Sequence, residues 1–299
     1  MKLGTNDIGS VYLGTNAVQK VYLGTNEVWT SFTGLLDTYS GAEAAYSLRK
    51  LSGSYSGDAI RVRRASDDTE QDIGFVDGEL DTSTLESFCS GTDGFVKTWY
   101  DQSGNGNDAT NSTASEQPQI VSAGSTITEN GKPAVKFDGS DDYFSTSQLL
   151  TNNTWSIFTT IKINSMASSW NLLGQHDGTA ATGRSQVIAN DTSTSKLRTF
   201  FNNGSSYNGL YSSSVSNQQY LVESLANNDD YFLTINGSIE EVISNQSLTP
   251  LNTNFLIGAI DGPVQPFIGA IQEIVIYTSD QSSNRTGIEN NINDFYSIY

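Results

Sequence analysis

The chain has 299 residues, with 33 acidic and 15 basic side chains and a net charge of −18, a length that suggests one large domain or one domain with an appendage. The acidic balance disfavours binding to nucleic acids and to anionic membranes, because both need a basic surface. It suits neutral partners such as sugars, or cations. Charged residues make up only 16% of the chain, while Ser, Thr, Asn and Gly are abundant. This composition favours strands and turns over helices.

Cysteine and histidine each occur once, as Cys89 and His176. A single cysteine excludes an intrachain disulfide, and a single histidine disfavours multi-histidine metal sites. The first residues lack the apolar core of a signal peptide, and no apolar run is long enough to cross a bilayer. We therefore expect a protein made in a cytoplasm, without membrane insertion, that leaves the cell by a route such as lysis if it works outside.

The first thirty residues contain an internal repeat with a period of ten. The tetrapeptide LGTN occurs at residues 3–6, 13–16 and 23–26. Each Gly-Thr-Asn predicts a turn, and the segment that follows, such as residues 17–23, predicts a short strand. A three-strand meander of this size cannot bury enough apolar surface to be stable by itself.

The apolar side chains of the repeat therefore need a cover. One interpretation is packing on the neighbouring domain, and the other is pairing of several copies or insertion into a larger assembly. We predict two domains, a β-repeat segment for anchoring or oligomerisation at 1–32 and a second domain at 33–299. The residues expected to make the contacts of the repeat are Leu3, Val11, Tyr12, Leu13, Val21, Tyr22 and Leu23.

Three segments after the repeat carry local patterns. Residues 36–51 predict a helix, because apolar residues recur there at helical spacing. Residues 59–64 alternate apolar and cationic side chains and predict a half-exposed strand, followed by an acidic loop that can pair with its arginines. Residues 81–88 predict a short helix capped by Asp81 or Thr82.

A bulky strand and a rigid polar loop meet in the stretch GFVKTWYDQSGNGNDAT, residues 94–110. The first part predicts a buried strand, and the Gly- and Asn-rich part that follows predicts a tight loop. One interpretation is a structural turn that holds two strands together. The other is a binding surface of a β-sandwich, in which Trp99 and Asp101 contact a sugar.

From residue 133 onward the pattern is β throughout. Many short strands separated by Asn-, Asp- and Gly-rich turns predict a closed sandwich, and residues 288–299 predict a helix that caps it. The expected strands are 134–137, 143–145, 155–163, 170–174, 185–189, 197–202, 219–224, 231–235, 254–258 and 269–277.

Two further groups of residues are candidate sites. Asp138, Asp141 and Asp142 lie close together on one loop, where grouped carboxylates suit Ca²⁺, although turn-forming Asp residues are the simpler explanation. His176 and Asp177 lie in an expected surface loop, where a lone His is more often solvated than catalytic.

The N-terminal repeat resembles the short VYLGTN-type repeats at the start of bacteriophage virion proteins such as head fibres and tail fibres. The resemblance covers residues 1–30 and implies a virion appendage, a class in which trimers are common.

The middle of the chain resembles a different family. AYSLR at 45–49, IRVRRASD at 60–67, QDI at 71–73, SFC at 87–89 and WYDQSGNGN at 99–107 occur in this order, as in the catalytic domain of family-54 α-L-arabinofuranosidases. The later part, from VKFDG at 135–139 onward, is similar to a laminin-G-like sandwich. The resemblance implies a mainly β fold, a concanavalin A-like (laminin-G-like) β-sandwich with a few short helices, preceded by the small β-repeat segment.

The resemblance also implies where the catalytic carboxylates of a retaining glycosidase would lie. The family's nucleophile is a Glu in an Asp-x-Glu-Asn-Gly stretch, for which the best match is 199–204, with Asn202 in place of the Glu. The family's acid/base Asp corresponds to Asp261, and its paired cysteines are absent around 170–174. An amide cannot form a glycosyl ester, which argues against hydrolysis unless Asp177 or Asp191 replaces the Glu.

These observations lead us to expect a phage structural protein and not an enzyme. It would be a virion-decorating head fibre, more than a tail fibre, made in the host cytoplasm as a homotrimer and bound to the capsid or another virion protein through residues 1–32. Its lectin-like domain would bind glycans, with no cofactor except a candidate Ca²⁺ site and no nucleic acid. The alternative is an active arabinofuranosidase-like glycoside hydrolase that acts on polysaccharide. The expected glycan-binding residues are Trp99, Asp101, Asn202, Asp261, His176 and Asp177.

Overall fold

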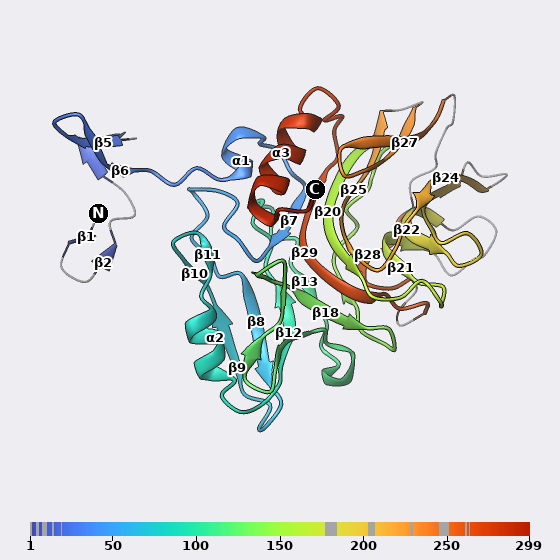
Figure 1. Cartoon of the computed structure of the whole chain (residues 1–299), viewed down its shortest axis with the longest axis horizontal. Coiled ribbons are helices and arrows are strands. Elements are labelled where there is room, and N and C mark those ends of the chain that lie inside the picture. The colour runs from blue at the N-terminus through green and yellow to red at the C-terminus, as the bar shows by residue number, and fades with distance from the viewer. Residues whose placement is uncertain are drawn as a thin grey trace.

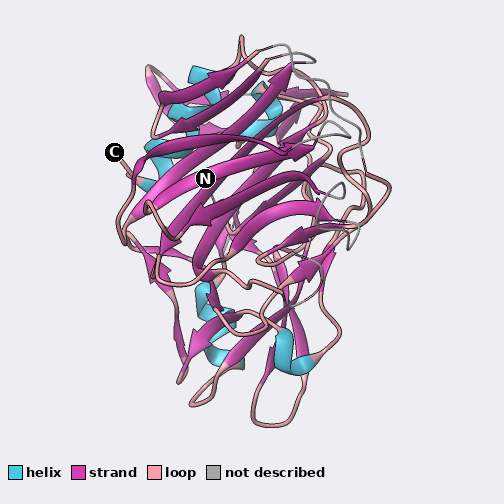
Figure 2. Cartoon of the chain, turned by 90° about the vertical axis from the view of Figure 1, so that its right-hand side faces the viewer, coloured by secondary structure: helices cyan, strands magenta, loops and turns pink. Residues whose placement is uncertain are grey.

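The computed structural model describes residues 2–3, 6–7, 11–13, 15–18, 20–176, 184–202, 207–227, 230–244, 251–260, 262 and 264–299. Their strands pair antiparallel, and one continuous sheet links 19 of them. Figure 1 shows this sheet curling into a body, with the N-terminal hairpins to one side. Figure 2 shows the long strands side by side in stacked layers. The prediction of a mainly β sandwich with few helices is confirmed.

Two layers of the sheet face one another across the main core. In the first layer the order is β7 (Ala44–Ser47), β29 (Ile268–Tyr277), β20 (Thr154–Ile163), β25 (Gln219–Asn227), β26 (Tyr231–Ile235) and β27 (Ser238–Ile243). In the second it is β19 (Phe144–Ser145), β28 (Phe255–Ile257), β21 (Asn171–His176), β22 (Arg184–Asp191), β23 (Lys196–Asn202) and β24 (Tyr207–Ser214). Trp155 and Val222 of the first layer and Leu172 and Leu197 of the second belong to the same buried cluster. Apolar burial between the layers is thus the main source of stability of this fold.

A smaller group of strands extends the sheet below the sandwich (Figure 1). It contains β8 (Ile60–Arg64), β9 (Glu70–Ile73), β12 (Gly94–Trp99), β13 (Ala109–Thr110), β14 (Gln119–Ser122), β15 (Ser125–Thr126) and β18 (Val135–Asp138). The short pairs are β10 (Phe75–Val76) with β11 (Glu79–Leu80) and β16 (Thr128–Glu129) with β17 (Lys132–Pro133). Helix α2 (Thr82–Phe88) and a 3₁₀ turn (Ala114–Glu116) complete this part.

Two helices cover the outer face of the first layer. Helix α3 (Arg285–Tyr296) and the single turn α1 (Leu35–Thr38) pack on side chains of β20, β25 and β29, such as Phe158 and Leu221. The expected C-terminal cap is confirmed. Of the helices in the described ranges, none has the length and apolar character that a membrane span requires.

Most expected elements are present, and the largest error concerns residues 36–51. The strand at 59–64, the Asp81-capped helix and the long strands after residue 133 are confirmed. The helix expected at 36–51 is wrong, because α1 ends at Thr38 and residues 44–47 form the buried strand β7. Every residue of β7 is buried, so the strand lacks the alternation that would have identified it. Gly41, at φ +86°, turns the chain between the two elements.

Strands β24 and β27 were not expected from the sequence. YNGLYSSS and SIEEVI are poor in the apolar alternation that marks a strand. Both are edge strands of their layers, where less of the surface is covered and polar side chains are tolerated.

The repeat segment forms three separate hairpins in place of the expected meander. They are β1 (Lys2–Leu3) with β2 (Asn6–Asp7), β3 (Val11–Leu13) with β4 (Asn16–Val18), and β5 (Lys20–Leu23) with β6 (Asn26–Thr30). The turn at Gly24-Thr25 is as expected. Residues 17–23 are not one strand, because β4 ends at Val18 and β5 begins at Lys20.

Candidate functional site

The loop after β12 is a structural clamp. Asp101 is buried, and its carboxylate accepts hydrogen bonds from the backbone N–H groups of Ala45 (2.8 Å), Ser103 (2.8 Å) and Asn107 (3.1 Å). Trp99 is fully buried in the core. The expectation that Trp99 and Asp101 bind glycan is therefore wrong, because neither is available to a sugar and Asp101 is already engaged by the backbone.

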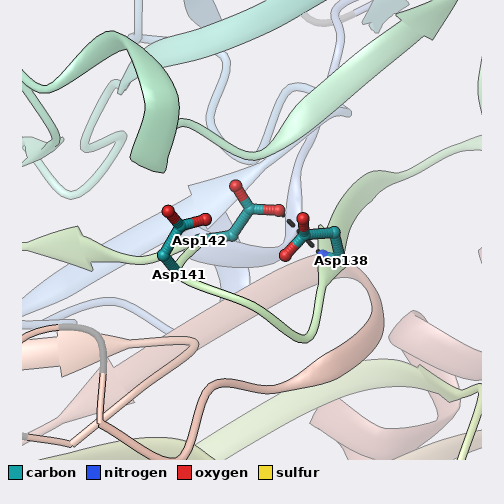
Figure 3. Close-up of side chains that lie close together, drawn as sticks. All are labelled: Asp138, Asp141 and Asp142. Atoms are coloured by element: carbon teal, nitrogen blue, oxygen red, sulfur yellow. Dashed lines mark hydrogen bonds between the residues drawn. The ribbon is translucent and has the colours of Figure 1, made fainter.

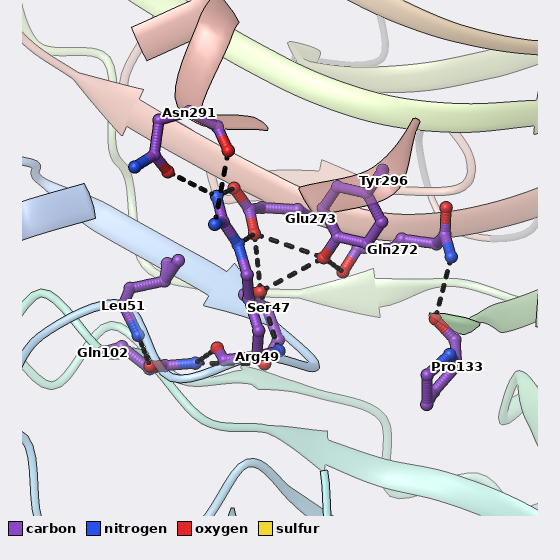
Figure 4. Close-up of polar contacts among 9 residues, drawn as sticks. All are labelled: Ser47, Arg49, Leu51, Gln102, Pro133, Gln272, Glu273, Asn291 and Tyr296. Atoms are coloured by element: carbon purple, nitrogen blue, oxygen red, sulfur yellow. Dashed lines mark hydrogen bonds and ion pairs between the residues drawn. The ribbon is translucent and has the colours of Figure 1, made fainter. Parts of the chain in front are cut away.

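The next residue of this loop ties it to the strand beneath the C-terminal helix. Gln102 accepts from the N–H of Leu51 at 2.8 Å and donates to the carbonyl oxygens of Ser47 and Arg49, both at 3.0 Å (Figure 4). All of its amide atoms are thus used in joining two backbone segments, which is a structural role.

A buried ion pair joins the same strand to β29 and α3 (Figure 4). The Arg49 guanidinium donates to both carboxylate oxygens of Glu273, at 2.7 and 2.9 Å, and also to Asn291 at 2.9 Å. Ser47 and Tyr296 donate hydroxyl hydrogen bonds to the same carboxylate. Glu273 is therefore fully engaged and cannot serve as a nucleophile or acid/base.

A pair of buried carboxylates lies between α3 and the strand β25. Glu223 on β25 is 1% exposed, and burial together with the carboxylate of Glu289 raises its pKa to about 8. Burial also raises the pKa of Glu289, which lies 3.3 Å from Arg285. Two carboxylates that favour a shared proton resemble a glycosidase pair in chemistry. Because α3 covers them, no sugar reaches them, and they are structural.

The three acidic residues predicted as a metal site do lie together. Carboxylate oxygens of Asp138, Asp141 and Asp142 lie within 4.8 Å of one another (Figure 3). Burial and the neighbouring carboxylates raise the pKa of Asp142 to about 7 despite a 2.8 Å hydrogen bond from the N–H of Asp138. A bound Ca²⁺ would relieve this repulsion, but the three side chains supply only part of the six to eight oxygens that the ion takes. The Ca²⁺ site remains a prediction.

His176 and Asn202 lie at the same end of the second layer. His176, the last residue of β21, pairs with Arg184 at the start of β22, and Asn202, at the end of β23, pairs with Tyr207. Asp177 and Asp261 lie outside the described residues, so their expected roles remain predictions.

The loop that follows β28 lies at the opposite end of this layer. The N–H of Gly258 donates to Leu172, and Ile260 packs on Ala189 of β22. Ala189 pairs with Asn171, the first residue of β21, whereas His176 is its last. Asn202 and the loop after β28 therefore lie at opposite ends of the second layer. The absence of a Glu at position 202 thus does not show whether a carboxylate lies near this loop.

Asp191 is one of the carboxylates that the structure describes at this end of the layer. It is the last residue of β22, two positions after Ala189, which corresponds to roughly 7 Å along a strand on the same face. Its carboxylate accepts from the hydroxyl of Ser193 at 2.7 Å and from its N–H at 2.9 Å. These hydrogen bonds lower the pKa of Asp191, so the carboxylate is ionised at neutral pH.

Asp191 also lines an open cavity of about 550 Å³. The other charged or aromatic side chains in its wall are Lys196, Tyr211, Glu240 and Glu241. The sequence did not identify them, because they come from three strands, two of which were not expected. Glu240 and Glu241 accept hydrogen bonds from the backbone N–H groups of β24, so they cover the edge of that strand.

Comparison with known proteins shows what parts of the chain resemble. Residues 37–151 match the family model for the catalytic domain of α-L-arabinofuranosidase B. α-L-Arabinofuranosidase B of Emericella nidulans (strain FGSC A4) is 44% identical over 64 residues, which are 21% of this chain and 12% of that protein.

Solved structures share the fold over most of the chain. An arabinofuranosidase complexed with arabinofuranosyl-α-1,2-xylobiose has a TM-score of 0.69 at 18% identity and covers 87% of this chain and 64% of its own. A GH54 α-L-arabinofuranosidase soaked with a cyclic sulfate inhibitor has a TM-score of 0.70 at 18% identity, with 87% and 65% covered. A mutant GH54 enzyme soaked with 4-nitrophenyl α-L-arabinofuranoside gives 0.70 at 19% identity and the same coverage. The chain thus spans less than two thirds of each of these relatives.

These matches overturn the expected function. A non-enzymatic virion fibre with a lectin-like domain was predicted, but the family model, the curated relative and the three structures are all of arabinofuranosidases. They favour the alternative, a glycoside hydrolase, and they give no support to a head fibre, a virion location or a homotrimer. The resemblance of residues 45–107 to family 54 is supported by the match at 37–151.

Proposed function

We propose that this chain is an α-L-arabinofuranosidase-type glycoside hydrolase that releases arabinofuranosyl groups from polysaccharide. The observation that carries the proposal is the match of residues 37–151 to the catalytic-domain model, within a body that shares the arabinofuranosidase fold over 87% of the chain. The net charge of −18 agrees with a neutral substrate, since a neutral sugar is not repelled by an acidic surface.

The proposed reaction centre is the end of the second layer that carries Asp191. A retaining glycosidase needs one ionised carboxylate as nucleophile and a second group that donates and then accepts a proton. Asp191 supplies an ionised carboxylate beside an open cavity. We assign the acid/base role to Asp261, because it follows Ile260, which packs on Ala189 of the same strand, and because it aligns with the acid/base Asp of family 54.

Five other carboxylates of the described chain fit these roles less well. Glu240 and Glu241 on β27 accept backbone hydrogen bonds from the neighbouring strand β24, whereas the bonds to Asp191 come from its own turn. Glu223 and Glu273 are buried on strands, and Glu289 is a buried residue of α3. Their geometry favours structural roles.

The test is release of 4-nitrophenol from 4-nitrophenyl α-L-arabinofuranoside and of arabinose from arabinoxylan. Asp191→Asn keeps the acceptor for Ser193 but cannot form the glycosyl ester, so we expect kcat to fall about 10³-fold or more. Asp261→Asn should lower kcat about 10²- to 10⁴-fold. The matched control is Asp280→Asn, because Asp280 is exposed and accepts from Ser282 N–H at 2.8 Å as Asp191 does from Ser193.

Two outcomes would contradict the proposal in different ways. Absence of arabinose release by the folded wild-type chain would reject the hydrolase function. Full activity of Asp191→Asn, with loss in Asp177→Asn or Glu241→Gln, would keep the function but reject this assignment of the nucleophile.

A further inference from the structure

We propose that the three N-terminal hairpins bind a second copy of this chain and thereby hold the protein as an oligomer. The repeat is the one motif of the sequence that the proposed hydrolase function does not use. The inference rests on the register, exposure and charge of residues 2–30, and it is independent of whether the body hydrolyses a glycoside.

The repeat gives each hairpin the same geometry. Leu and Asn of each LGTN pair across the turn, as Leu3 with Asn6, Leu13 with Asn16, and Leu23 with Asn26. The loop is therefore the two residues Gly-Thr, and Gly24 has φ +65°, which a two-residue hairpin loop with Gly in first position requires. The same edge pattern thus recurs every ten residues along the chain.

Two leucines and two tyrosines of the second and third hairpins face solvent. Leu13 is 78% exposed and Leu23 is 76% exposed, and Tyr12 and Tyr22 are also exposed. No other leucine of the described chain is among its exposed large hydrophobic residues. A repeated pair of exposed leucines beside aromatic rings marks an interaction surface, because single apolar side chains need no cover whereas clustered ones do.

The strand pairing of the hairpins is limited. Among the described residues, each hairpin pairs only within itself and is a two-stranded sheet. A lone two-stranded hairpin is marginally stable in water, while three or more strands with a covered apolar face are stable. Pairing with another hairpin would satisfy edge N–H and C=O groups and cover the leucines together.

The ten-residue spacing favours a second copy as the occupant, and the charge of the repeat segment does not oppose it. Residues 1–32 contain two Lys, Asp7 and Glu27, so their net charge is zero, and the remaining residues carry 13 basic and 31 acidic side chains, a net charge of −18. Two bodies therefore repel each other, whereas two repeat segments do not. A second copy also offers the same open edges at the same ten-residue spacing, so several hairpins can pair in register at once.

The position of the hairpins allows this contact. They lie to one side of the body, joined to it by an extended segment that follows β6 (Figure 1). The ring centroid of Phe32, a residue of this segment, lies 5.7 Å from Nζ of Lys50, and the ring packs against Gly78. The segment thus contacts the body at Phe32, and the hairpins precede this contact in the chain.

The test is the mass of the full chain in solution, by sedimentation velocity and light scattering from 1 to 100 µM. We expect at least twice the chain mass of 32.3 kDa in the upper part of this range. The double variant Leu13→Ser/Leu23→Ser should be a monomer. Added NaCl should strengthen association, because it screens repulsion between the bodies and leaves apolar contacts in place.

The matched control is Val76→Ser/Ile239→Ser, two exposed apolar residues of the body at 51% and 50% exposure, which should associate as the wild type does. Equal melting temperatures of the three proteins would show that the body is folded in each. A wild-type monomer at 100 µM, an oligomer that persists in Leu13→Ser/Leu23→Ser, or loss of association in the body control would overturn the proposal. Because this readout is mass, failure of the hydrolase assay would not affect it.

Discussion

The framework around β7 and the outer end of the second layer use polar residues in opposite ways. In the framework, Asp101, Gln102, Arg49 and Glu273 are buried, and their polar atoms are engaged by the backbone or by one another. At the end of β22, Asp191 lines an open cavity together with Lys196 and Tyr211. The first arrangement fixes the chain, and the second leaves charged groups available to a ligand.

This difference explains which part of the chain resembles the family. The matched segment, residues 37–151, lies in the framework and contains the clamp at WYDQSGNGN. Its similarity therefore follows the hydrogen bonds that hold the sandwich together. The cavity lies after residue 151, in strands that resemble the relatives in fold. Three experiments test whether the framework and the cavity have these different roles. Changes in the framework should alter stability, and changes in the cavity should alter activity.

The largest effect on stability is expected for Arg49→Ala. It leaves the Glu273 carboxylate buried without its cation, so the free energy of unfolding should fall by about 3–5 kcal/mol. Urea denaturation monitored by fluorescence measures this change. The control is Arg61→Ala, which removes a partly exposed pair with Asp72 at 2.6 Å and should cost about 1 kcal/mol or less. Equal losses in the two variants would mean that the Arg49 cluster has no special role in the framework.

An intermediate effect is expected from the carboxylate of Glu223. Its pKa is about 8 in the folded chain and near the ordinary 4.5 when unfolded. The folded state therefore binds more protons between these values, and stability should fall as pH rises from 5 to 8, by up to about 1.4 kcal/mol per pH unit. Glu223→Gln should flatten this fall.

The pH series needs one further variant, because Asp142, whose pKa is about 7, contributes over the same range. Glu223→Gln should therefore leave a smaller slope, and Glu223→Gln/Asp142→Asn should remove most of it. An unchanged slope in both variants would contradict the assignment of these two buried carboxylates as the proton-binding groups.

The smallest effect on stability is expected at Tyr211, which is 37% exposed in the cavity wall. Tyr211→Ala should change the free energy of unfolding by about 0.5 kcal/mol, as for other surface substitutions. A sugar that packs on an aromatic ring gains roughly 1 kcal/mol, so kcat/KM for the arabinofuranoside should fall about fivefold. Unchanged kinetics would mean that the substrate does not contact Tyr211 and would contradict a ligand-binding role of the cavity.

Local patterns in the sequence identified many elements of the fold. The alternation in 60–64, the Asp81 cap and the long apolar strands after residue 133 were all found in the structure. Each depends on neighbours a few residues apart, so each can be found from a short window of sequence. β7 could not, because β29 pairs with it on one side, the loop at Asp101 and Gln102 bonds it on the other, and the burial of all its residues removes the alternation.

The sequence by itself determined the β-rich composition, the acidic surface, the repeated Gly-Thr turns and the family resemblance. Only the tertiary structure decided which polar residues are clamps and which line a cavity. Asp101 follows a strand, Asp191 ends one, and both accept hydrogen bonds from a residue two positions on, so the local sequence does not distinguish their roles. The first is covered by β7 and the second is open to solvent, because burial depends on segments far away in the chain.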